Sequence, residues 1–288
     1  MLDIVSALPQ RVLIAAPATL SAGWYVDGAL GDPGDVTATI TRADGSVLVE
    51  DVAAAGSGVD ERTLSLDAGQ LAELADLTVT WQSDDLGELT THAHVVGGFM
   101  FTVNGARALK PLDNTVSYPL ESILAARTLA EMALEETCAV AFVPRFHRET
   151  LGGKGTTKLF TGQPLPRRVI SATIAGTALN AGELAELQVD PARGFIWRPA
   201  GWPAGERNVV IEYEHGHPSP PANGPRAALL LAKRYLVDSP VNDRATTLIN
   251  QDGTTQFLVT AGVKGAVFDL PEVNAFVSGF QTSDLFVA

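Results

Sequence analysis

The stretch "DVTATITRADGSVLVEDV", residues 35–52, predicts two antiparallel β-strands joined by a tight turn. Val36, Ala38 and Ile40 alternate with threonines, which is the period-2 pattern of a strand with one buried face. The segment "ADGS" at 43–46 is typical of a hairpin turn, and the alternation resumes at Val47. This hairpin assigns the surrounding fold to the antiparallel β class.

The same signals recur on the C-terminal side of the hairpin. Residues 62–96, "RTLSLDAGQLAELADLTVTWQSDDLGELTTHAHVV", give further short strands with turn residues between them. Within them Leu77, Val79 and Trp81 point to one side of their strand. Several short strands at this spacing predict an immunoglobulin-like β-sandwich over residues 1–103.

Charge marks a boundary near residue 103. The chain has 288 residues and a formal net charge of -13. Residues 1–103 carry 15 acidic and 3 basic side chains, whereas residues 104–288 carry 18 and 17. We therefore expect residues 1–103 to fold as an independent unit. The acidic total argues against a conventional nucleic-acid binder, which needs cations to neutralise phosphates.

Other features of the sequence bear on where the chain works. Cys138 is the single cysteine, so an internal disulfide is excluded. The first residues lack the basic region of a secretory signal, and no apolar run reaches the roughly 18 residues of a membrane span. We expect a soluble protein made in a cytoplasm.

Residues 104–243 mix helices and strands. The segment "LESILAARTLAEMALEETCAVAF", residues 120–142, predicts a helix with Ser117 as its cap. Strands are predicted at 168–174 and around Val209–Glu214, and a second helix over 226–238. The apolar stripe of the first helix consists of Ile123, Ala126, Ala130, Ala133 and Leu134.

Residues 244–288 are predicted to form a C-terminal arm. A hairpin is expected around Asp252–Gly253 and a short helix from about Leu270 to Ser278, with Asp269 and Glu272 as a capping box. The helix carries four apolar residues at positions i, i+3, i+4 and i+7, namely Val273, Phe276, Val277 and Phe280.

Two His-x-His pairs raise the possibility of a metal site. His215 and His217 follow Glu212 and Glu214, and a second pair stands at 92 and 94. The two pairs fall in different predicted domains, and Gly216 ends the strand that would have to present the first pair. We therefore expect a strand end at this position and no metal.

The sequence matches neither a catalytic motif nor a cofactor-binding motif in full. The segment "LGGKGTTK" at 151–158 resembles a phosphate loop, but Lys154 is followed by glycine where that motif needs Ser or Thr. It predicts an exposed loop. Cys138 has small apolar neighbours and predicts a buried thiol rather than a nucleophile. We expect a protein that is not an enzyme and that uses no cofactor.

Residues 117–280 resemble the head-to-tail adaptor, or connector, proteins of long-tailed phages of actinobacterial hosts. The resemblance rests on the order of the segments, and most specifically on "SPVNDRAT", the "NQDGT" turn and "LPEVNAFV" at 239–277. It implies an α+β multidomain chain in which the sandwich precedes a mixed helical and β adaptor domain, followed by an extended C-terminal arm. The sandwich itself is an addition to that family's pattern.

The resemblance also implies partners. Such adaptors form a ring, usually dodecameric, between the portal and the head-closure or tail proteins of the virion. Double-stranded DNA passes through the ring without sequence-specific binding, and no membrane is involved. We expect the contacts with other subunits to come from the C-terminal arm, through Leu270, Val273, Phe276, Val277, Phe280 and Phe257.

A second function stays open on the sequence. A β-sandwich with Trp24 and Trp81 is also compatible with a carbohydrate-binding or adhesin-like module on a virion or cell surface. The competing interpretation of these tryptophans is core packing.

Overall fold

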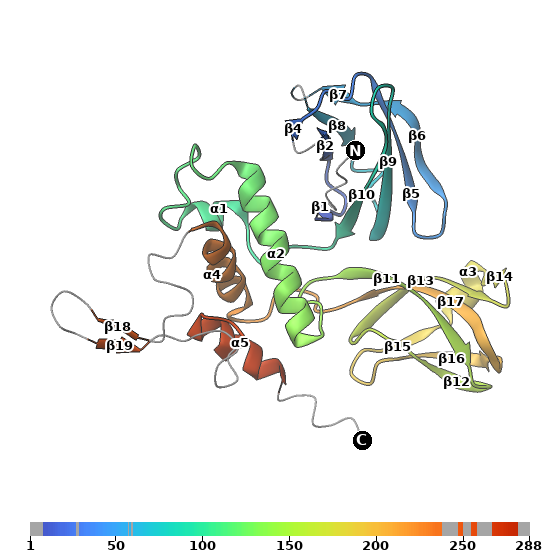
Figure 1. The fold of residues 1–288 in the computed structure, drawn as a ribbon. Helices are drawn as coiled ribbons and strands as arrows, with labels where there is room; N and C mark the ends of the chain where they lie inside the picture. The colour runs from blue at the N-terminus through green and yellow to red at the C-terminus, as the bar shows by residue number, and fades with distance from the viewer. Residues whose placement is uncertain are drawn as a thin grey trace. The chain divides into compact units, whose positions relative to one another are not determined.

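The computed structural model describes residues 8–26, 29–56, 58, 60–237, 247–249, 255–257 and 267–281 (Figure 1). The chain is a mixed α+β protein, with many strands and few helices. It divides into two compact units, of which one comprises Met1–Gly98 with Val143–Pro218 and the other Phe99–Phe142 with Ser219–Ala288. A β-rich segment is thus inserted between the two halves of a helical unit.

The N-terminal part is the predicted two-layered β-sandwich. The larger sheet has the order β1-β10-β9-β5-β6 and the smaller one β2-β8-β7. The larger sheet contains β1 (Gln10–Leu13), β5 (Val36–Arg42), β6 (Val47–Ala53), β9 (Ala75–Ser83) and β10 (Gly87–Val96). The others are β2 (Ala18–Gly23), β7 (Ala55–Gly56), β8 (Glu61–Leu66) and the paired strands β3 (Tyr25–Val26) and β4 (Ala29–Leu30).

The core of the sandwich confirms the alternation in the sequence. Val36, Ala38 and Ile40 are buried on β5, and Leu77, Val79 and Trp81 are buried on β9. Trp24 and Trp81 meet edge to face, with ring centroids 6.4 Å apart. The indole N–H of Trp81 donates a hydrogen bond of 2.9 Å to the hydroxyl of Thr91. The buried residues of this core cluster all come from residues 12–95.

The inserted segment forms a second β body with a core of its own. One sheet has the order β11-β17-β13-β14, built from β11 (Arg145–Gly153), β13 (Pro166–Ile174), β14 (Thr177–Ala178) and β17 (Gly205–His215). The other has the order β12-β16-β15, built from β12 (Thr156–Phe160), β15 (Gln188–Asp190) and β16 (Phe195–Trp202), and α3 (Ala181–Ala185) precedes β15. Both sheets contribute to one cluster, which contains Leu159, Ala172, Ile196, Trp202, Val209, Ile211 and Tyr213.

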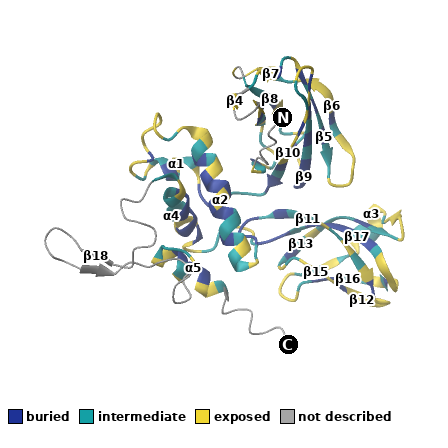
Figure 2. Cartoon of the chain, in the orientation of Figure 1, coloured by how far each residue is buried: buried dark blue, intermediate teal, exposed yellow. Residues whose placement is uncertain are grey.

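In the described residues of the helical unit, four helices pack around one apolar core. These helices are α1 (Val103–Arg107), α2 (Leu120–Cys138), α4 (Gly224–Leu236) and α5 (Pro271–Gln281). Figure 2 shows buried residues along one side of α2 and α4. The predicted stripe of α2 is confirmed, because four of its members are buried and Ala133 packs against them.

The start of α2 differs from the prediction. Its first residue is Leu120 and its N-cap is Pro119 rather than Ser117. The side-chain oxygen of Asn114 already accepts hydrogen bonds from the backbone N–H groups of Val116 and Ser117. Ser117 therefore belongs to the preceding turn.

Two charged residues of α2 are buried, which its apolar stripe does not predict. The carboxylate of Glu131 accepts a hydrogen bond of 2.7 Å from the backbone N–H of Met100. The guanidinium of Arg127 lies 3.4 Å above the ring centroid of Phe99. These contacts attach the segment before α1 to the middle of α2.

The division into units differs from the predicted boundaries at 103 and 243. Residues 104–243 do not form one unit, because their middle is grouped with the sandwich and their ends belong to the helical unit.

In the described part of the chain, no helix is both long and apolar enough to cross a bilayer. Two strands flank the predicted turn, β18 (Thr247–Ile249) and β19 (Thr255–Phe257), and they pair with each other. The turn at Asp252–Gly253 lies outside the described residues.

Candidate functional site

The His-Gly-His segment marks the end of a strand, as predicted. β17 ends at His215, and Gly216 has φ +96°, a conformation that residues with a side chain rarely adopt. The ring of His215 packs edge to face against His147 at 5.8 Å and Tyr213 at 6.1 Å between centroids. Burial lowers the pKa of both His147 and His217. These contacts are those of an aromatic cluster.

Glu212 and Glu214 are held by ion pairs. Both glutamates alternate with the apolar residues of β17, a pattern that predicts a face turned toward solvent or toward a second surface. Glu212 is buried. Its carboxylate accepts hydrogen bonds from Arg148 and from the Ser171 hydroxyl, the latter at 2.7 Å. Glu214 lies 3.0 Å from Nε of Arg167. Neighbouring strands of the sheet thus supply the counter-charges for β17.

A third carboxylate fixes the loop after β12. Glu149 accepts a hydrogen bond of 2.8 Å from the Tyr213 hydroxyl and another from the backbone N–H of Gly162. The Tyr213 oxygen in turn accepts the backbone N–H of Gln163. Burial is the main cause that raises the pKa of Tyr213 above its usual range. This network is structural and leaves the tyrosine protonated.

Metal ligands do not come together in the described residues. Within these ranges, no group of three or more His, Cys, Asp or Glu side chains is placed to hold a metal ion. His92 and His94 lie on β10, where His94 faces Asp76 across the strand pair. That the protein needs no metal stays a prediction.

Asp76 gives the sandwich a dependence on pH. Its Oδ1 lies 3.8 Å from Nε2 of His94. Burial raises the pKa of Asp76 from 3.8 to about 6, and the positive charge of Arg145 acts in the opposite direction. Between these two values the folded chain holds a proton that the unfolded chain has released. The free energy of unfolding should therefore fall as the pH rises through this interval, and it should then stay level.

We expect Asp76→Asn to remove this loss of stability. At pH 7 the free energy of unfolding of the variant should be about 1 kcal/mol higher than that of the parent. This value is discounted for solvent screening, because the Asp76 side chain is 47% exposed. At about pH 3 the two proteins should unfold alike, because the aspartate is then mostly protonated in both states. Urea unfolding at both pH values measures the difference. A variant that is less stable than the parent at pH 7 contradicts the expectation.

The glycine-rich segment is exposed from Lys154 onward, as predicted, but Gly152 and Gly153 belong to β11, and residues 154–155 join it to a strand of the other sheet. β11 continues to Gly153 and β12 begins at Thr156. A Cβ atom at Gly153 would lie 1.9 Å from the carbonyl oxygen of Pro203. The glycine therefore allows two backbones to approach each other closely, and no phosphate-binding role is needed to explain it.

Cys138 is half-buried against the core of the helical unit, whereas the sandwich tryptophans are core residues. Burial raises the pKa of the Cys138 thiol to about 11, which disfavours the nucleophilic thiolate. Trp24 and Trp81 are 1% and 0% exposed. Neither ring is available to a ligand.

The predicted contact residues of α5 lie in the core of their own unit. Val273, Phe276 and Val277 are buried, and Leu270 and Phe280 pack against the same cluster. The surrounding charges also belong to this unit, because Asp269 pairs with Arg234 and Glu272 with Arg226, both on α4. The apolar stripe of α5 is thus buried by residues of the same chain. Phe257 lies on β19, and its side chain falls outside the described residues.

An array of aromatic and polar side chains, partly exposed and with Phe195 buried in its middle, lies on the sheet β12-β16-β15. Strand pairing places Trp197 between Lys158 and Gln188, and Phe195 between Phe160 and Asp190. We call these six residues the aromatic face. Phe160 is 60% exposed, and its ring meets that of Phe195 at 5.8 Å between centroids. Sequence patterns missed this face because it depends on the register of three strands.

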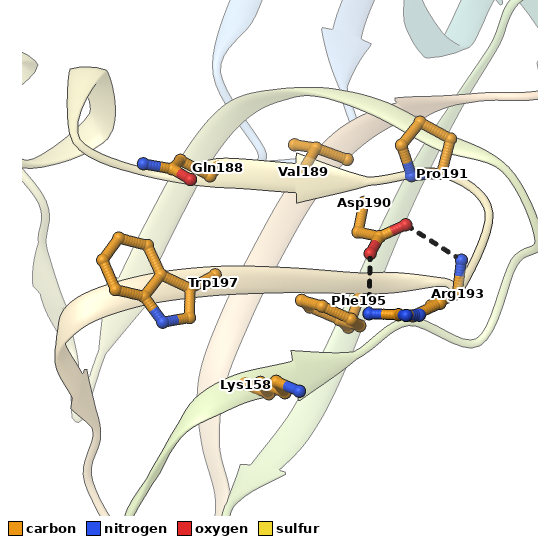
Figure 3. A pocket seen from close by; sticks show the side chains of 8 residues that line it. All are labelled: Lys158, Gln188, Val189, Asp190, Pro191, Arg193, Phe195 and Trp197. Atoms are coloured by element: carbon orange, nitrogen blue, oxygen red, sulfur yellow. Dashed lines mark hydrogen bonds and ion pairs between the residues drawn. The ribbon is translucent and has the colours of Figure 1, made fainter.

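An open pocket of about 510 Å³ lies on the aromatic face (Figure 3). Phe195 lies between Trp197 at one end and the turn with Pro191 and Arg193 at the other. The ammonium of Lys158 lies 4.8 Å from the ring centroid of Phe195. The guanidinium of Arg193 is 3.9 Å from the carboxylate of Asp190. Aromatic surface and polar groups thus lie side by side.

Comparisons with known proteins reach only part of the chain. No protein-family model and no curated protein matches it. Among solved structures, the ZIG-8–RIG-5 IG1–IG1 heterodimer is 15% identical and covers 33% of this chain and 86% of that one, with a TM-score of 0.22. Dpr1 IG1 bound to DIP-eta IG1 is 13% identical over 33% of this chain and 94% of that one, with a TM-score of 0.23. Likenesses of this extent carry no argument about function.

Proposed function

We propose that this chain is a structural virion protein, a subunit of the ring that joins the portal of a long-tailed phage to its head-closure or tail proteins. The order of segments over residues 117–280 supports this proposal, as does the helical unit that those segments build. The protein would be made in the host cytoplasm and act in the virion. It would need neither a cofactor nor a catalytic site.

The observation that carries the proposal is the hairpin between α4 and α5. Among the described strands, β18 and β19 pair only with each other. Isolated two-stranded hairpins are marginally stable in water, and each free edge offers unpaired backbone N–H and C=O groups. A neighbouring subunit or the portal would complete such a sheet by adding a strand. In a ring, an adjacent subunit would be in position to add this strand.

The charge of the chain agrees with a DNA passage. With a net charge of -13, the protein has no excess of cations to hold phosphates. Neutralisation of phosphates by cations supplies most of the free energy of non-specific DNA binding, so a channel wall without excess cations lets packaged DNA slide.

The alternative function, a carbohydrate-binding sandwich, depended on Trp24 and Trp81. Their burial removes that argument.

The experiment must leave α5 in place, because a deletion that includes α5 would also remove part of the core of the helical unit. Replacing residues 247–257 with a flexible Gly-Ser linker keeps α4 and α5 in place. The portal protein encoded in the same genome is mixed with the parent and with the variant. Co-sedimentation and electron microscopy then report the assembly, and thermal unfolding of the free chain reports the fold.

We expect the parent to form a ring on the portal and the hairpin variant to lose that binding with an unchanged melt. Asp85→Asn, on an exposed turn of the sandwich, serves as the matched control and should bind like the parent. A parent chain that does not bind the portal overturns the proposed function. A hairpin variant that still assembles overturns the role of the hairpin.

A further inference from the structure

The aromatic face exposes apolar rings that the fold does not need for its core. Phe160 is 60% exposed opposite Phe195, and Trp197, two residues further along the same strand as Phe195, is partly exposed. The residues that alternate with them, Leu159 and Ile196, are the ones that fill the core between the two sheets. Exposed aromatic groups gathered on one surface are typical of recognition sites.

The backbone holds this face in place before any ligand arrives. β16 is the central strand of its sheet and is paired with both β12 and β15. The indole N–H of the buried Trp202 donates a hydrogen bond of 3.2 Å to the carbonyl of Ile196, on the reverse side of the sheet. Rings mounted on a fixed sheet lose little conformational freedom on binding, which favours affinity.

The polar groups around the rings have mixed character. Gln188 offers both donors and acceptors, Asp190 accepts, and Lys158 and Arg193 donate. Their formal charges sum to only +1, and Arg193 lies next to Asp190. A ligand with several hydroxyl groups and no charge matches this set. The volume of about 510 Å³ lies within the roughly 300–1,000 Å³ of small-molecule sites.

We infer that the aromatic face binds a neutral saccharide. The C–H face of a sugar ring would pack on Trp197 and Phe160, because the face of an aromatic ring carries a negative charge density that attracts C–H hydrogens. The hydroxyl groups would exchange hydrogen bonds with Gln188, Asp190 and Arg193. This site is independent of the proposed connector role, and it assigns to the β body a carbohydrate-binding function that the sandwich tryptophans cannot supply.

Single-stranded nucleic acid is the competing ligand class, because bases also stack on exposed aromatic rings. Such ligands require a track of cations along their phosphates, and binding then weakens steeply with salt. The face has Lys158 and Arg193 only, in a chain with a net charge of -13. The charges therefore favour the uncharged saccharide.

The test measures binding of the full chain to a panel of neutral oligosaccharides built from glucose, galactose, mannose, rhamnose and N-acetylglucosamine. Isothermal titration follows up each hit. We expect at least one hit, and we expect Trp197→Ala and Phe160→Ala each to weaken it by about tenfold, as the loss of one stacked ring does. Tyr25→Ala, which removes an aromatic ring 41% exposed on the sandwich, should leave binding unchanged.

The controls separate the outcomes. Thermal unfolding and circular dichroism of both variants show whether the β body is intact, and Phe160→Leu keeps an apolar side chain while it removes the ring. Absence of binding across the panel at millimolar concentration overturns the inference, as does binding that Trp197→Ala and Phe160→Leu leave intact. Salt-sensitive binding of a thymidine oligonucleotide that Lys158→Ala abolishes would assign the face to nucleic acid instead. Assembly on the portal should be unaffected by Trp197→Ala, so a failure here leaves the connector proposal standing.

Discussion

Trp81→Ala is expected to destabilise the sandwich by about 3–5 kcal/mol, the range measured for large aromatic residues truncated in a core. Trp81 is 0% exposed and contacts the edge of Trp24 at 6.4 Å between centroids. Its removal would leave a cavity between the two sheets and would take the donor away from Thr91, which is itself buried. A loss of this size is a large part of the 5–15 kcal/mol that usually stabilises a domain.

Hydrogen exchange locates the effect of this change. The core cluster around Trp81 draws its buried residues from residues 12–95 only. Peptides from β5, β9 and β10 should therefore lose protection in Trp81→Ala, whereas peptides from α2 and α4 should keep theirs. Gln82→Ala changes the next, exposed residue of β9 and should stay within about 0.5 kcal/mol of the parent. Equal loss of protection in both units would contradict the separation of their cores.

The sandwich was the part of the fold that sequence patterns predicted best. Alternation at Val36–Ile40 and Leu77–Trp81 is a local signal, and a strand with one buried face needs no distant information to be recognised. The end of β17 was predicted for the same reason, because Gly216 and the prolines after it act within a few residues.

The grouping of segments could not be predicted from such signals. Phe142 and Phe276 are 134 positions apart in the sequence, yet their ring centroids lie 5.1 Å apart. The charge of the sequence changes near residue 103, but no comparable change in composition occurs at residues 142–143 or 218–219, where the chain passes from the helical unit to the β body and back. Contacts between distant segments are set by packing, which local patterns do not report.

The candidate site was missed for a related reason. Lys158, Gln188 and Trp197 come from three strands, and only their register places them in one row. In the sequence each is an isolated residue with an ordinary alternation around it. The sequence did call attention to Trp24 and Trp81, whose strand pattern is equally compatible with burial, and they are buried.

The last prediction concerns α5, for which the sequence favoured a partner-binding role. Phe276→Ala is expected to destabilise the helical unit of the free protein by about 3–5 kcal/mol. Its ring lies 5.1 Å from Phe142 and 5.0 Å from Phe280, and the residue is 8% exposed. Truncation would therefore open a cavity beside the two remaining rings, and it would also weaken the attachment of a helix too short to persist alone.

A second change on the same helix gives a control of opposite sign. Gly279 is exposed, and a Cβ atom there would meet nothing within 4 Å, so Gly279→Ala should stabilise α5 by about 0.5–1 kcal/mol. Urea unfolding of the free chain, read by hydrogen exchange in α2 and α5, compares both variants with the parent. If Phe276→Ala left the free protein as stable as the parent and abolished only its binding to the portal, α5 would be a docking helix after all. A loss of stability in the absence of any partner instead assigns the stripe to the core, and the proposed contact with a neighbouring chain then rests on the paired strands β18 and β19 alone.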